Sequence, residues 1–430
     1  MTPLLDLAYL SALAAASPYL AYRSLRSGRY RRQPLARLFG PAALPATRQP
    51  RAWFHGVSVG EVHLLRQVLA GFRERRPDWE CVVSASTDTG LDEAKRCFAD
   101  LTVIPFPLDF SWAVRRALAA VNPRLLVLAE GELWPNMLRA AKARGVKTAV
   151  INGRFSPRSA RRYQRFAALA RPMLQRVDLY AMQTEEYADN LRQIGVPSTR
   201  VAVTGSVKYD GLAGDRAGPK TIELGRTFGI VPGDLVWVAG STQAPEEQIV
   251  LDAFRRLRAK HANLKLILVP RQRDRFDEVA KLLDKCSVPY ARRSRLKAAA
   301  TTPVVLLDTM GELSAAWGLA DVAYVGGSMD GVRGGQNMLE PASFGAAVTF
   351  GPHVWNFRDA AARLVAEGGA VQVADAAELE RATAALLADP SRRKRMGAAA
   401  RRLVLSQQGA TAKTLDLLDF LIAPRVAKAG

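Results

Sequence analysis

The 430-residue sequence is poor in the side chains that form disulfides and bind metals. It has only four histidines and three cysteines, and Cys81, Cys97 and Cys286 lack the spacing of a metal site or a redox pair. No Asp-x-Asp occurs, so the pattern of a metal-chelated diphosphate site is missing. A sparse, odd set of cysteines is typical of a reducing compartment. We therefore expect neither a metal nor another cofactor.

The sequence also lacks a Ser or Cys nucleophile elbow, an internal repeat and any low-complexity tract. A composition of 49% hydrophobic and 23% charged residues is typical of a globular protein. The chain is too long for one ordinary hydrophobic core. We therefore expect two domains.

Acidic residues are in the minority, 40 against 61 Lys and Arg, which gives a formal charge of +21. This balance favours an anionic partner, such as nucleic acid, an anionic membrane face or a phosphorylated substrate. The alternative is a protein that simply carries arginine at many solvated positions. Because no recognised nucleic-acid motif occurs, charge is the only feature that supports nucleic acid.

The amino-terminal run TPLLDLAYLSALAAASPYLAYR, residues 2–23, holds one acid and no base before Arg23. Arginines follow the run, whereas a secretory signal carries its basic residues before it, so we expect the rest of the chain to be cytoplasmic. Asp6 and Pro18 weaken the run as a membrane span, so the helix either crosses the membrane or lies at its interface. The remaining alternative is a buried first helix of the soluble domain. We expect a membrane anchor over residues 1–25.

Beyond residue 50, short β-rich runs alternate with stretches of helical composition, which predicts an α/β fold with parallel, doubly wound sheets. The predicted strands are Arg51–Val57, Glu80–Ser86, Val103–Phe106, Leu125–Leu128, Thr148–Ile151, Leu179–Met182, Val201–Val203, Leu235–Val238, Leu264–Val269, Val304–Leu307, Val322–Val325 and Val348–Phe350. The alternation breaks at DGLAGDRAGPK, residues 210–220, which is typical of a linker. We therefore expect Rossmann-like domains over residues 26–212 and 213–430, with the option that the C-terminal helices pack back on the first domain.

Glycine is concentrated in GGSMDGVRGGQNMLEP, residues 326–341, directly after a predicted strand. In open α/β sheets ligands bind beyond the carboxyl ends of strands, and glycine lets the backbone come close to a ligand. A helix that begins near Asn337 would offer N–H groups to a phosphate, and Glu340 could accept hydrogen bonds from a ribose diol. The spacing is not that of a dinucleotide fingerprint. The alternative is a plain glycine turn.

Three more segments follow predicted strands in the same half of the chain: AGSTQ at 239–243, Arg271 after LILVP, and DTMGEL at 308–313. The guanidinium of Arg271 is suited to a phosphate or a carboxylate. Four such segments in one domain favour a nucleotide site over four unrelated turns.

Acidic residues follow predicted strands in the first half. Glu61 stands at the start of a helix, and EGELWPN at 130–136 adds Glu130 and Glu132. Carboxylates at the carboxyl end of a strand are candidates for acid/base catalysis, although Glu61 could also be a helix-capping residue. INGRFSPRSARRY, residues 151–163, carries four arginines that either bind phosphates of an acceptor or form a solvated helix face.

A dozen motifs in a fixed order resemble those of the 3-deoxy-D-manno-octulosonic acid (Kdo) transferases of lipid A assembly, over essentially the whole chain. They are HGVSVGEV, STDTG, PFPLDF, EGELWPN, INGRFSPRS, VTGSVKYD, AGSTQAPEE, LVPRQRDRF, DTMGEL, YVGGS, GGQNMLEPA and GPHVWNF. The resemblance implies a GT-B glycosyltransferase, two Rossmann-like domains facing across a cleft, with an N-terminal membrane-associated helix. It also implies inverting, metal-independent transfer of Kdo from CMP-Kdo to the tetra-acylated disaccharide bisphosphate precursor of lipid A, at the cytoplasmic face of the inner membrane.

The resemblance also implies roles for single residues. Glu61 would be the general base that deprotonates the acceptor hydroxyl. The acceptor side of the cleft would be lined by Glu130, Glu132, Arg154, Ser156, Ser159 and Lys208. The donor would be held by Ser241, Thr242, Arg271, Met310, Gly311, Gly326, Gly327, Ser328, Asn337 and Glu340. We expect Glu340 on the ribose, the glycine amides on the phosphate and Arg271 on the Kdo carboxylate.

Three positions depart from the family pattern, because Gln243, Gln272 and Gln336 stand where histidine is usual. Glutamine keeps a hydrogen-bonding side chain but carries no charge near neutral pH. If a histidine neutralises the donor in the family, this protein binds CMP-Kdo more weakly or prefers another acid sugar. The remaining alternatives are a transferase or epimerase of UDP-sugars, a basic nucleic-acid-binding protein and an inactive scaffold. The basic balance and the anchor favour the family activity, since the acceptor carries phosphates and lies in an anionic membrane.

Overall fold

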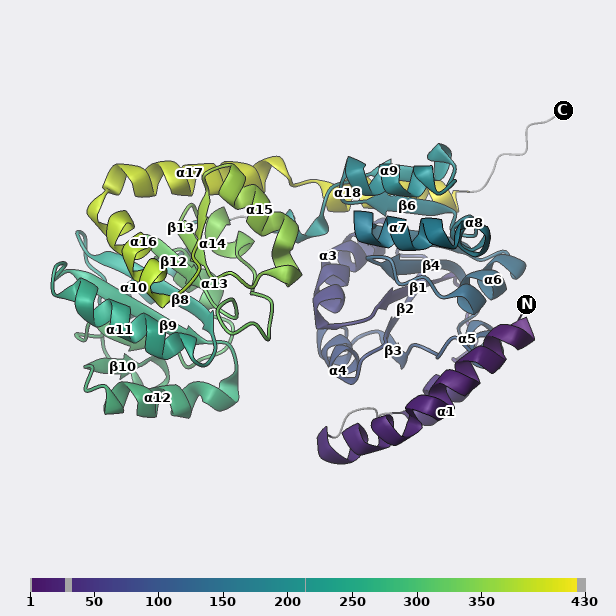
Figure 1. The fold of residues 1–430 in the computed structure, drawn as a ribbon, viewed down its shortest axis with the longest axis horizontal. Coiled ribbons are helices and arrows are strands. Elements are labelled where there is room, and N and C mark those ends of the chain that lie inside the picture. The colour runs from purple at the N-terminus through teal and green to yellow at the C-terminus, as the bar shows by residue number, and fades with distance from the viewer. Residues whose placement is uncertain (1, 28–32, 213, 424–430) are drawn as a thin grey trace. The chain divides into compact units, whose positions relative to one another are not determined.

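The computed structural model describes residues 2–27, 33–212 and 214–423, and it forms two compact units (Figure 1). Unit 1 comprises Met1–Asp210 and Gln408–Gly430, and unit 2 comprises Gly211–Gln407. Residues 28–32, which include Arg29, Arg31 and Arg32, lie outside the described residues.

Unit 1 is built on a parallel sheet of seven described strands in the order β3-β2-β1-β4-β5-β6-β7. The strands are β1 (Arg51–Gly56), β2 (Glu80–Ala85), β3 (Thr102–Pro105), β4 (Pro123–Ala129), β5 (Lys147–Gly153), β6 (Leu179–Met182) and β7 (Val201–Val203). Its helices are α1 (Thr2–Ser27), α2 (Pro34–Phe39), α3 (Val59–Arg75), α4 (Asp88–Cys97), α5 (Ser111–Val121), α6 (Pro135–Ala143), α7 (Pro157–Arg165), α8 (Ala167–Leu174), α9 (Glu185–Gln193) and α18 (Ala410–Ile422).

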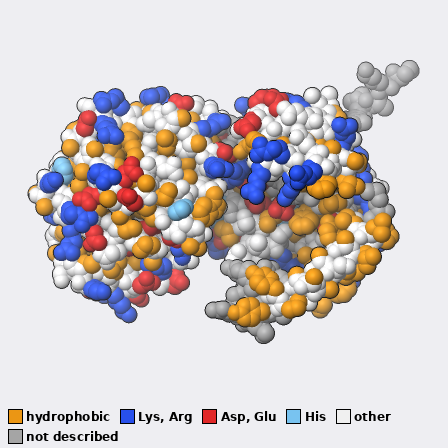
Figure 2. Space-filling view, viewed as in Figure 1, with side chains coloured by type: hydrophobic (Ala, Val, Ile, Leu, Met, Phe, Trp, Pro, Cys, Tyr) orange, Lys and Arg blue, Asp and Glu red, His pale blue; other side chains and the backbone are white. Residues whose placement is uncertain are grey.

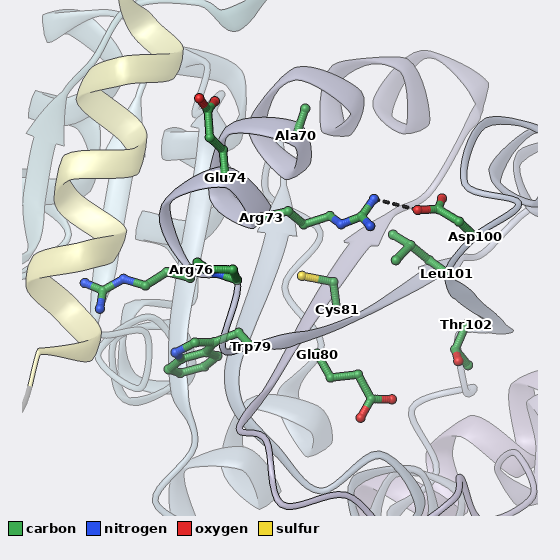
Figure 3. A pocket seen from close by; sticks show the side chains of 11 residues that line it. Ala70, Arg73, Glu74, Arg76, Trp79, Glu80, Cys81, Asp100, Leu101 and Thr102 are labelled. Atoms are coloured by element: carbon green, nitrogen blue, oxygen red, sulfur yellow. Dashed lines mark ion pairs between the residues drawn. The ribbon is translucent and has the colours of Figure 1, made fainter.

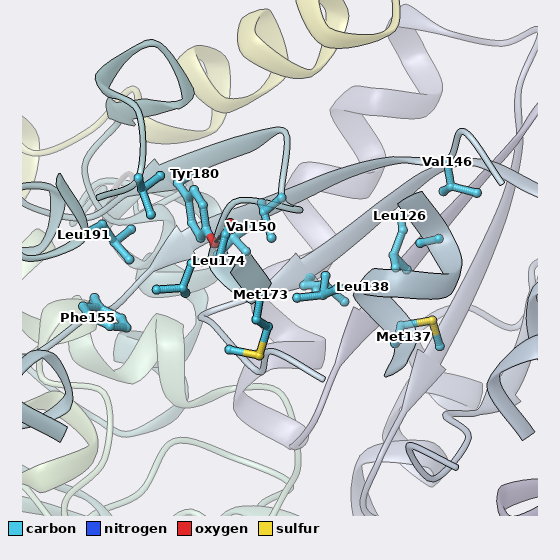
Figure 4. Close-up of a cluster of buried hydrophobic side chains, with 14 of the residues drawn as sticks. Leu126, Met137, Leu138, Val146, Val150, Phe155, Met173, Leu174, Tyr180 and Leu191 are labelled. Carbon is cyan, nitrogen blue, oxygen red and sulfur yellow. Dashed lines mark hydrogen bonds between the residues drawn. The ribbon is translucent and has the colours of Figure 1, made fainter. Parts of the chain in front are cut away.

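Both faces of this sheet are covered, which explains why its strands are continuous apolar runs. Along β4, Leu126 and Leu128 point to one face and Leu125 and Val127 to the other, as the two-residue period of a strand requires. The first face packs on α5, α6, α8 and α9, and the second on α3, α4 and α18. Figure 4 shows side chains of α6, α8 and α9 in the cluster on the first face.

Unit 2 repeats this plan with a parallel sheet of seven described strands in the order β10-β11-β9-β8-β12-β13-β14. The strands are β8 (Leu235–Thr242), β9 (Leu264–Pro270), β10 (Tyr290–Arg292), β11 (Val304–Leu306), β12 (Val322–Val325), β13 (Ala347–Phe350) and β14 (Ala370–Gln372). Its helices are α10 (Pro219–Thr227), α11 (Glu246–Arg258), α12 (Phe276–Lys285), α13 (Leu313–Trp317), α14 (Leu339–Ser343), α15 (Arg358–Ala366), α16 (Ala376–Ala388) and α17 (Pro390–Ser406).

In each sheet the chain starts at an inner strand, fills one side and then crosses to the other; in unit 2 the strand β11 inserts between β9 and the edge strand β10. The crossing makes neighbours of β1 and β4 in unit 1 and of β8 and β12 in unit 2. The loops after these neighbours leave in opposite directions, and the crevice between them is the usual ligand site of such a fold. We call these two places the switch points.

Every strand predicted from the sequence is present, and the prediction of doubly wound parallel sheets is confirmed. Two strands were missed, β10 and β14, which have three residues each and lie at the edges of the second sheet. An edge strand has a neighbour on one side only, so it does not need the apolar run that marks a central strand.

Helix α1 packs on unit 1 through polar groups near its start. Asp6 is buried and accepts hydrogen bonds from Ser111 N (2.9 Å) and Asn136 Nδ2 (3.2 Å), while the Tyr9 hydroxyl donates to Asp109 (3.2 Å). Leu4 and Leu7 are 71% and 59% exposed, so α1 is not the buried core helix that was one alternative. Within the described residues, no helix combines the length and the apolar character needed to cross a membrane.

Helix α18 belongs to unit 1, although it follows unit 2 in the sequence, and it packs beside β5, β6 and α3 (Figure 1). Asp210 fixes its first turn, since one carboxylate oxygen accepts from Gly409 N (2.6 Å) and the other from Thr411 N. Asp210 is also the residue at which the chain leaves unit 1, so one side chain ties together the exit from this unit and the return to it.

Replacing Asp210 with Ala should destabilise unit 1, because two amides of the first turn of α18 lose their acceptor. A lost helix cap costs about 1–2 kcal/mol, which corresponds to a fall in Tm of roughly 2–8 °C for a domain of this size. Scanning calorimetry checks this. Asp215→Ala, which removes one turn contact to Ala217 N, is the matched control, and an equal shift in both variants would contradict the proposed capping role.

Candidate active site

Glu61 lies at the switch point of unit 1, in the first turn of α3 directly after β1. Its Oε2 accepts a hydrogen bond from Val57 N at 2.7 Å, and the Ser58 hydroxyl lies 3.4 Å from Oε1. Gly56 permits this approach, because a Cβ at residue 56 would stand 3.1 Å from the Glu61 Cβ. The carboxylate is therefore held in place by one strong hydrogen bond, and Oε1 is engaged only weakly.

The surroundings of Glu61 favour its neutral form. Burial raises the pKa of this carboxyl to about 7, the negative charges of Glu130 and Glu132 act in the same direction, and the Val57 N–H opposes them. A carboxylate that titrates near neutral pH can accept a proton from a substrate and release it again. The geometry therefore suits the base that the sequence predicts at this position.

Glu130 follows β4, the neighbour of β1, and so reaches the same switch point. Its backbone has a φ of +60°, a left-handed conformation that is uncommon for residues other than glycine and that recurs at functional sites. Lys208 Nζ lies 2.9 Å from Oε1, and Asn152 Nδ2 donates to the same oxygen at 3.3 Å. Glu132, two residues on, is exposed. The structure thus brings Glu61, Glu130, Glu132 and Lys208 together.

Asn152 was missed from the sequence. It is the penultimate residue of β5, has a φ of +50°, donates to Glu130, and accepts a hydrogen bond from Val207 N at 3.0 Å through its Oδ1. Asn152 therefore ties the segment of Val207 and Lys208 to β5. The signal was a lone Asn at the end of a buried strand, where an apolar residue would be expected.

The segment after β5 holds three more predicted residues. Arg154 donates its backbone N–H to Glu130 O (2.9 Å), which joins the loop after β5 to the loop after β4. Ser156 caps α7 by accepting from Ser159 N (3.3 Å), and the two hydroxyls lie 3.2 Å apart. Ser156 and Ser159 therefore have a structural task that needs no ligand.

The second predicted site lies at the carboxyl edge of the unit 2 sheet. Because β11, β9, β8 and β12 are consecutive in that sheet, the segments that follow them line one edge, as the sequence indicated. Arg271 is exposed there, and its backbone N–H donates a hydrogen bond to Thr242 O at 3.0 Å. Met310 is 63% exposed and Gly311 has a φ of +88°. Ser241 and Thr242 are buried, so they shape this edge from within.

Glu340 lies at the start of the short helix α14, close to the charge of Arg271. Burial raises the pKa of this carboxyl, while the hydrogen bond from Asn337 Nδ2 (3.1 Å) and the Arg271 charge act against the rise. Asn337 also accepts from Leu339 N at 3.2 Å. Arg271, Asn337 and Glu340 therefore form one polar group at this edge.

The amides of residues 326–328, which the sequence predicts on the donor phosphate, have hydrogen-bond partners within the protein. Gly327 N and Ser328 N donate to the carboxylate of Glu246 at 2.7 and 2.9 Å, and Gly326 N donates to Gly240 O at 2.9 Å. The Ser328 hydroxyl donates to Val325 O at 2.8 Å and is fully buried. Because these groups are already paired within the protein, their contact with a phosphate stays a prediction.

The three glutamines that depart from the family pattern have different surroundings. Gln243 is buried, and among the described residues its Oε1 has no hydrogen-bond partner. Gln336 packs over Gly327, where a Cβ would lie 3.2 Å from its Nε2. Gln272 is exposed. Only Gln243 and Gln336 therefore shape the interior of the edge described above.

Two other features of unit 1 are separate from the group of Glu61, Glu130, Glu132 and Lys208. A cavity of about 650 Å³ at the amino ends of β2 and β3 (Figure 3) is on the opposite edge of the sheet, and its Arg73 and Arg76 are already paired with Asp100 and Asp419 at 2.7 Å each. On α3 and α4, His63, Glu93 and Cys97 form the single group of potential metal ligands among the described residues. Glu93 is also paired with Arg96.

Comparisons with known proteins agree with this architecture. A family model described as 3-Deoxy-D-manno-octulosonic-acid transferase (kdotransferase) matches residues 26–211. The chain is 34% identical over 418 residues to the 3-deoxy-D-manno-octulosonic acid transferase of Haemophilus influenzae, covering 95% of this chain and 97% of the relative. It is 35% identical over 403 residues to the corresponding protein of Bordetella pertussis, covering 89% and 91%.

A solved glycosyltransferase from Rickettsia africae has the same fold, with a TM-score of 0.54 at 9% identity, covering 87% of this chain and 99% of that one. At this identity the likeness concerns the fold alone. With the two parallel sheets it shows a GT-B architecture.

The raised pKa of Glu61 predicts that Glu61→Gln stabilises the protein in a pH-dependent way. The folded-state pKa of Glu61 lies above the pKa of an ordinary carboxyl. Its contribution to folding stability is therefore fully present at a pH below the ordinary pKa and is lost as the pH rises through about 7. At about pH 8 the variant should gain about 1–3 kcal/mol in free energy of unfolding. At about pH 4, where Glu61 is neutral in both states, the gain should be small.

Denaturant titrations at both pH values measure this difference. Glu74→Gln, on the exposed side of the same helix, is the matched control. A gain for Glu61→Gln that is the same at both pH values would contradict the origin assigned to it.

Proposed function

The chain belongs to the Kdo transferase family of glycosyltransferases, and we propose that it transfers Kdo from CMP-Kdo to a hydroxyl of a phosphorylated lipid A precursor. The observation that carries this proposal is Glu61, a carboxyl with a pKa of about 7, placed at the switch point of a chain that aligns with Kdo transferases over nearly its whole length.

Glu61 acts as the general base in this proposal. Its Oε1 takes the proton of the acceptor hydroxyl as the oxygen attacks the anomeric carbon of Kdo. The bond from that carbon to the phosphate oxygen breaks, and CMP leaves with the electron pair. Attack from the side opposite the leaving group inverts the anomeric centre. Glu130 and Glu132 keep Glu61 basic enough for this step, and Lys208 balances the charge of Glu130.

The donor is held by unit 2 in this proposal. The guanidinium of Arg271 suits the anionic part of CMP-Kdo, and as the charge on the phosphate grows during bond breaking it stabilises the leaving group. No metal is required for a monophosphate leaving group when such a cation is present. Glu340, oriented by Asn337, accepts hydrogen bonds from the ribose hydroxyls.

The acceptor is proposed to meet the basic surface of α7 and α8. Arg158, Arg161 and Arg162 are exposed on α7, and Figure 2 shows Lys and Arg side chains gathered over this helix beside hydrophobic ones. Phe166 and Leu169 follow at 59% and 66% exposure. Arginines suit the phosphates of the precursor, and the apolar side chains suit its acyl chains.

We also propose that the protein lies at the cytoplasmic face of the inner membrane. Exposed apolar side chains on α1, Leu4, Leu7 and Leu10 among them, suit insertion into a membrane interface without crossing it. The net positive charge adds attraction to anionic lipids.

Mass spectrometry of lipid products tests the reaction. Membranes that contain the protein receive CMP-Kdo and a tetra-acylated precursor, and the wild type should yield Kdo-modified lipid while Glu61→Gln should lose activity by about 100-fold or more. The number of added masses counts the Kdo units. Parallel reactions with another CMP-activated acid sugar and with UDP-sugars test the alternatives raised by the three glutamines. Product from one of these donors alone would contradict CMP-Kdo as the substrate.

Glu340→Gln should weaken donor binding, because the neutral amide is a poorer acceptor for two ribose hydroxyls and its NH₂ faces them as a donor. We expect the KM for CMP-Kdo to rise about tenfold or more, with Tm within a few degrees of the wild type. Glu223→Gln, at an exposed position of α10 in the same unit, is the control. An unchanged KM would remove Glu340 from the donor site.

A further inference from the structure

Glu246 is a buried carboxylate that spans the switch point of unit 2. It is the first residue of α11, after β8, and 1% of its surface is exposed. Its Oε2 accepts hydrogen bonds from Gln243 N (3.0 Å) on its own side and from Gly327 N (2.7 Å) in the loop after β12. Its Oε1 accepts from Ser328 N (2.9 Å), Met329 N (3.1 Å) and the Tyr324 hydroxyl (2.8 Å).

The three successive amides of residues 327–329 form a concave group of donors around this carboxylate. Such an arrangement is an anion-binding nest, a feature that often holds a phosphate. Here the nest holds the carboxylate of the protein itself. Burial of Glu246 raises its pKa, but the hydrogen bonds from Gly327 and Ser328 favour the ionised form and offset part of the cost.

Glycine at residue 326 is required by this contact. A Cβ there would lie 2.7 Å from Glu246 Oε2 and 2.6 Å from the Thr242 Cα, so no side chain fits. Gly327 has a φ of +66°, which turns its amide and the next ones toward the carboxylate. Part of the glycine density in this stretch thus serves the approach of Glu246.

The contact extends to the proposed donor residues through the loop. Gly327 O accepts a hydrogen bond from Gly335 N at 2.7 Å, and Gln336 packs over Gly327. Asn337 and Glu340 follow directly, joined by their own hydrogen bond. The position of Gly327, set by Glu246, therefore sets where the segment with Asn337 and Glu340 begins.

We propose that Glu246 is a positioning residue for donor binding. Its carboxylate occupies the nest of the loop after β12 and so fixes the segment that binds CMP-Kdo. The inference rests on the proposed function for the identity of the ligand. It implies that the donor phosphate is bound outside the nest. It also implies that removing the charge of Glu246 harms donor binding more than acceptor binding.

The neighbouring Glu247 provides a matched control. It is equally buried, at 1% exposure, and stands in the same turn of α11, but it pairs with Arg275 at 2.6 Å. Glu247→Gln therefore removes a buried charge beside Glu246 without touching the loop of residues 326–329.

The experiment compares Glu246→Gln and Glu247→Gln in the full chain. The new amide places an NH₂ group against backbone donors, so in Glu246→Gln hydrogen–deuterium exchange at residues 327–329 should become faster by about tenfold or more. The KM for CMP-Kdo should rise about tenfold, with the KM for the acceptor within about twofold of the wild type. In Glu247→Gln the donor KM and the exchange at 327–329 should stay at wild-type values, whatever its Tm.

An unchanged donor KM in Glu246→Gln, or equal changes in both variants, would overturn the positioning role. If Glu246→Gln does not fold, Tyr324→Phe removes one donor from the carboxylate, and the expected rise in donor KM is about threefold. No rise there would also overturn the proposal. If wild-type protein does not use CMP-Kdo, the proposed function fails, whereas faster exchange in Glu246→Gln alone still supports the contact.

Discussion

The structure depends on one recurring contact, a carboxylate just after the first strand of a parallel sheet that accepts hydrogen bonds from backbone amides. Glu61 holds this place after β1 and Glu246 holds it after β8. Glu61 is largely buried, has one strong backbone donor and has two negative neighbours, so it keeps its proton up to about neutral pH and can exchange it there. Glu246 has five donors among the described residues, so its charge is used to hold a loop. Similar positions thus suit catalysis in one unit and positioning in the other.

Much of the fold could be predicted because strands that are buried on both faces have continuous apolar sequences, such as RLLVLA before Glu130. The edge strands β10 and β14 were not predicted, because a partly covered strand of three residues such as Tyr290–Arg292 has no such apolar sequence. Helix α18 shows another limit. The sequence left open whether the C-terminal helices pack back on the first domain. It could not decide this, because the contact with Asp210 that assigns α18 to unit 1 joins residues 199 positions apart.

The candidate site could be predicted in part for a similar reason. Residues at the ends of predicted strands, such as Glu61, Glu130 and Arg271, can be placed at one edge of a sheet from strand order alone. Asn152 and Glu246 were missed because their importance lies in partners from distant loops, Val207 for the first and residues 327–329 for the second. The glycine loop shows the same limit, since its spacing suggests an anion-binding nest but does not say that the carboxylate of Glu246 lies in it.

The pH dependence of kcat/KM for the acceptor tests the central claim most directly, because it reports the ionisation of the base in the enzyme before the acceptor binds. With saturating CMP-Kdo, the account predicts a rate that rises tenfold per pH unit at low pH and levels off with an apparent pKa of about 7. The residual activity of Glu61→Gln should not show this rise with pH. A rise in kcat/KM with an apparent pKa near the ordinary carboxyl value of about 4.3, or a rise that persists in Glu61→Gln, would contradict Glu61 as the base.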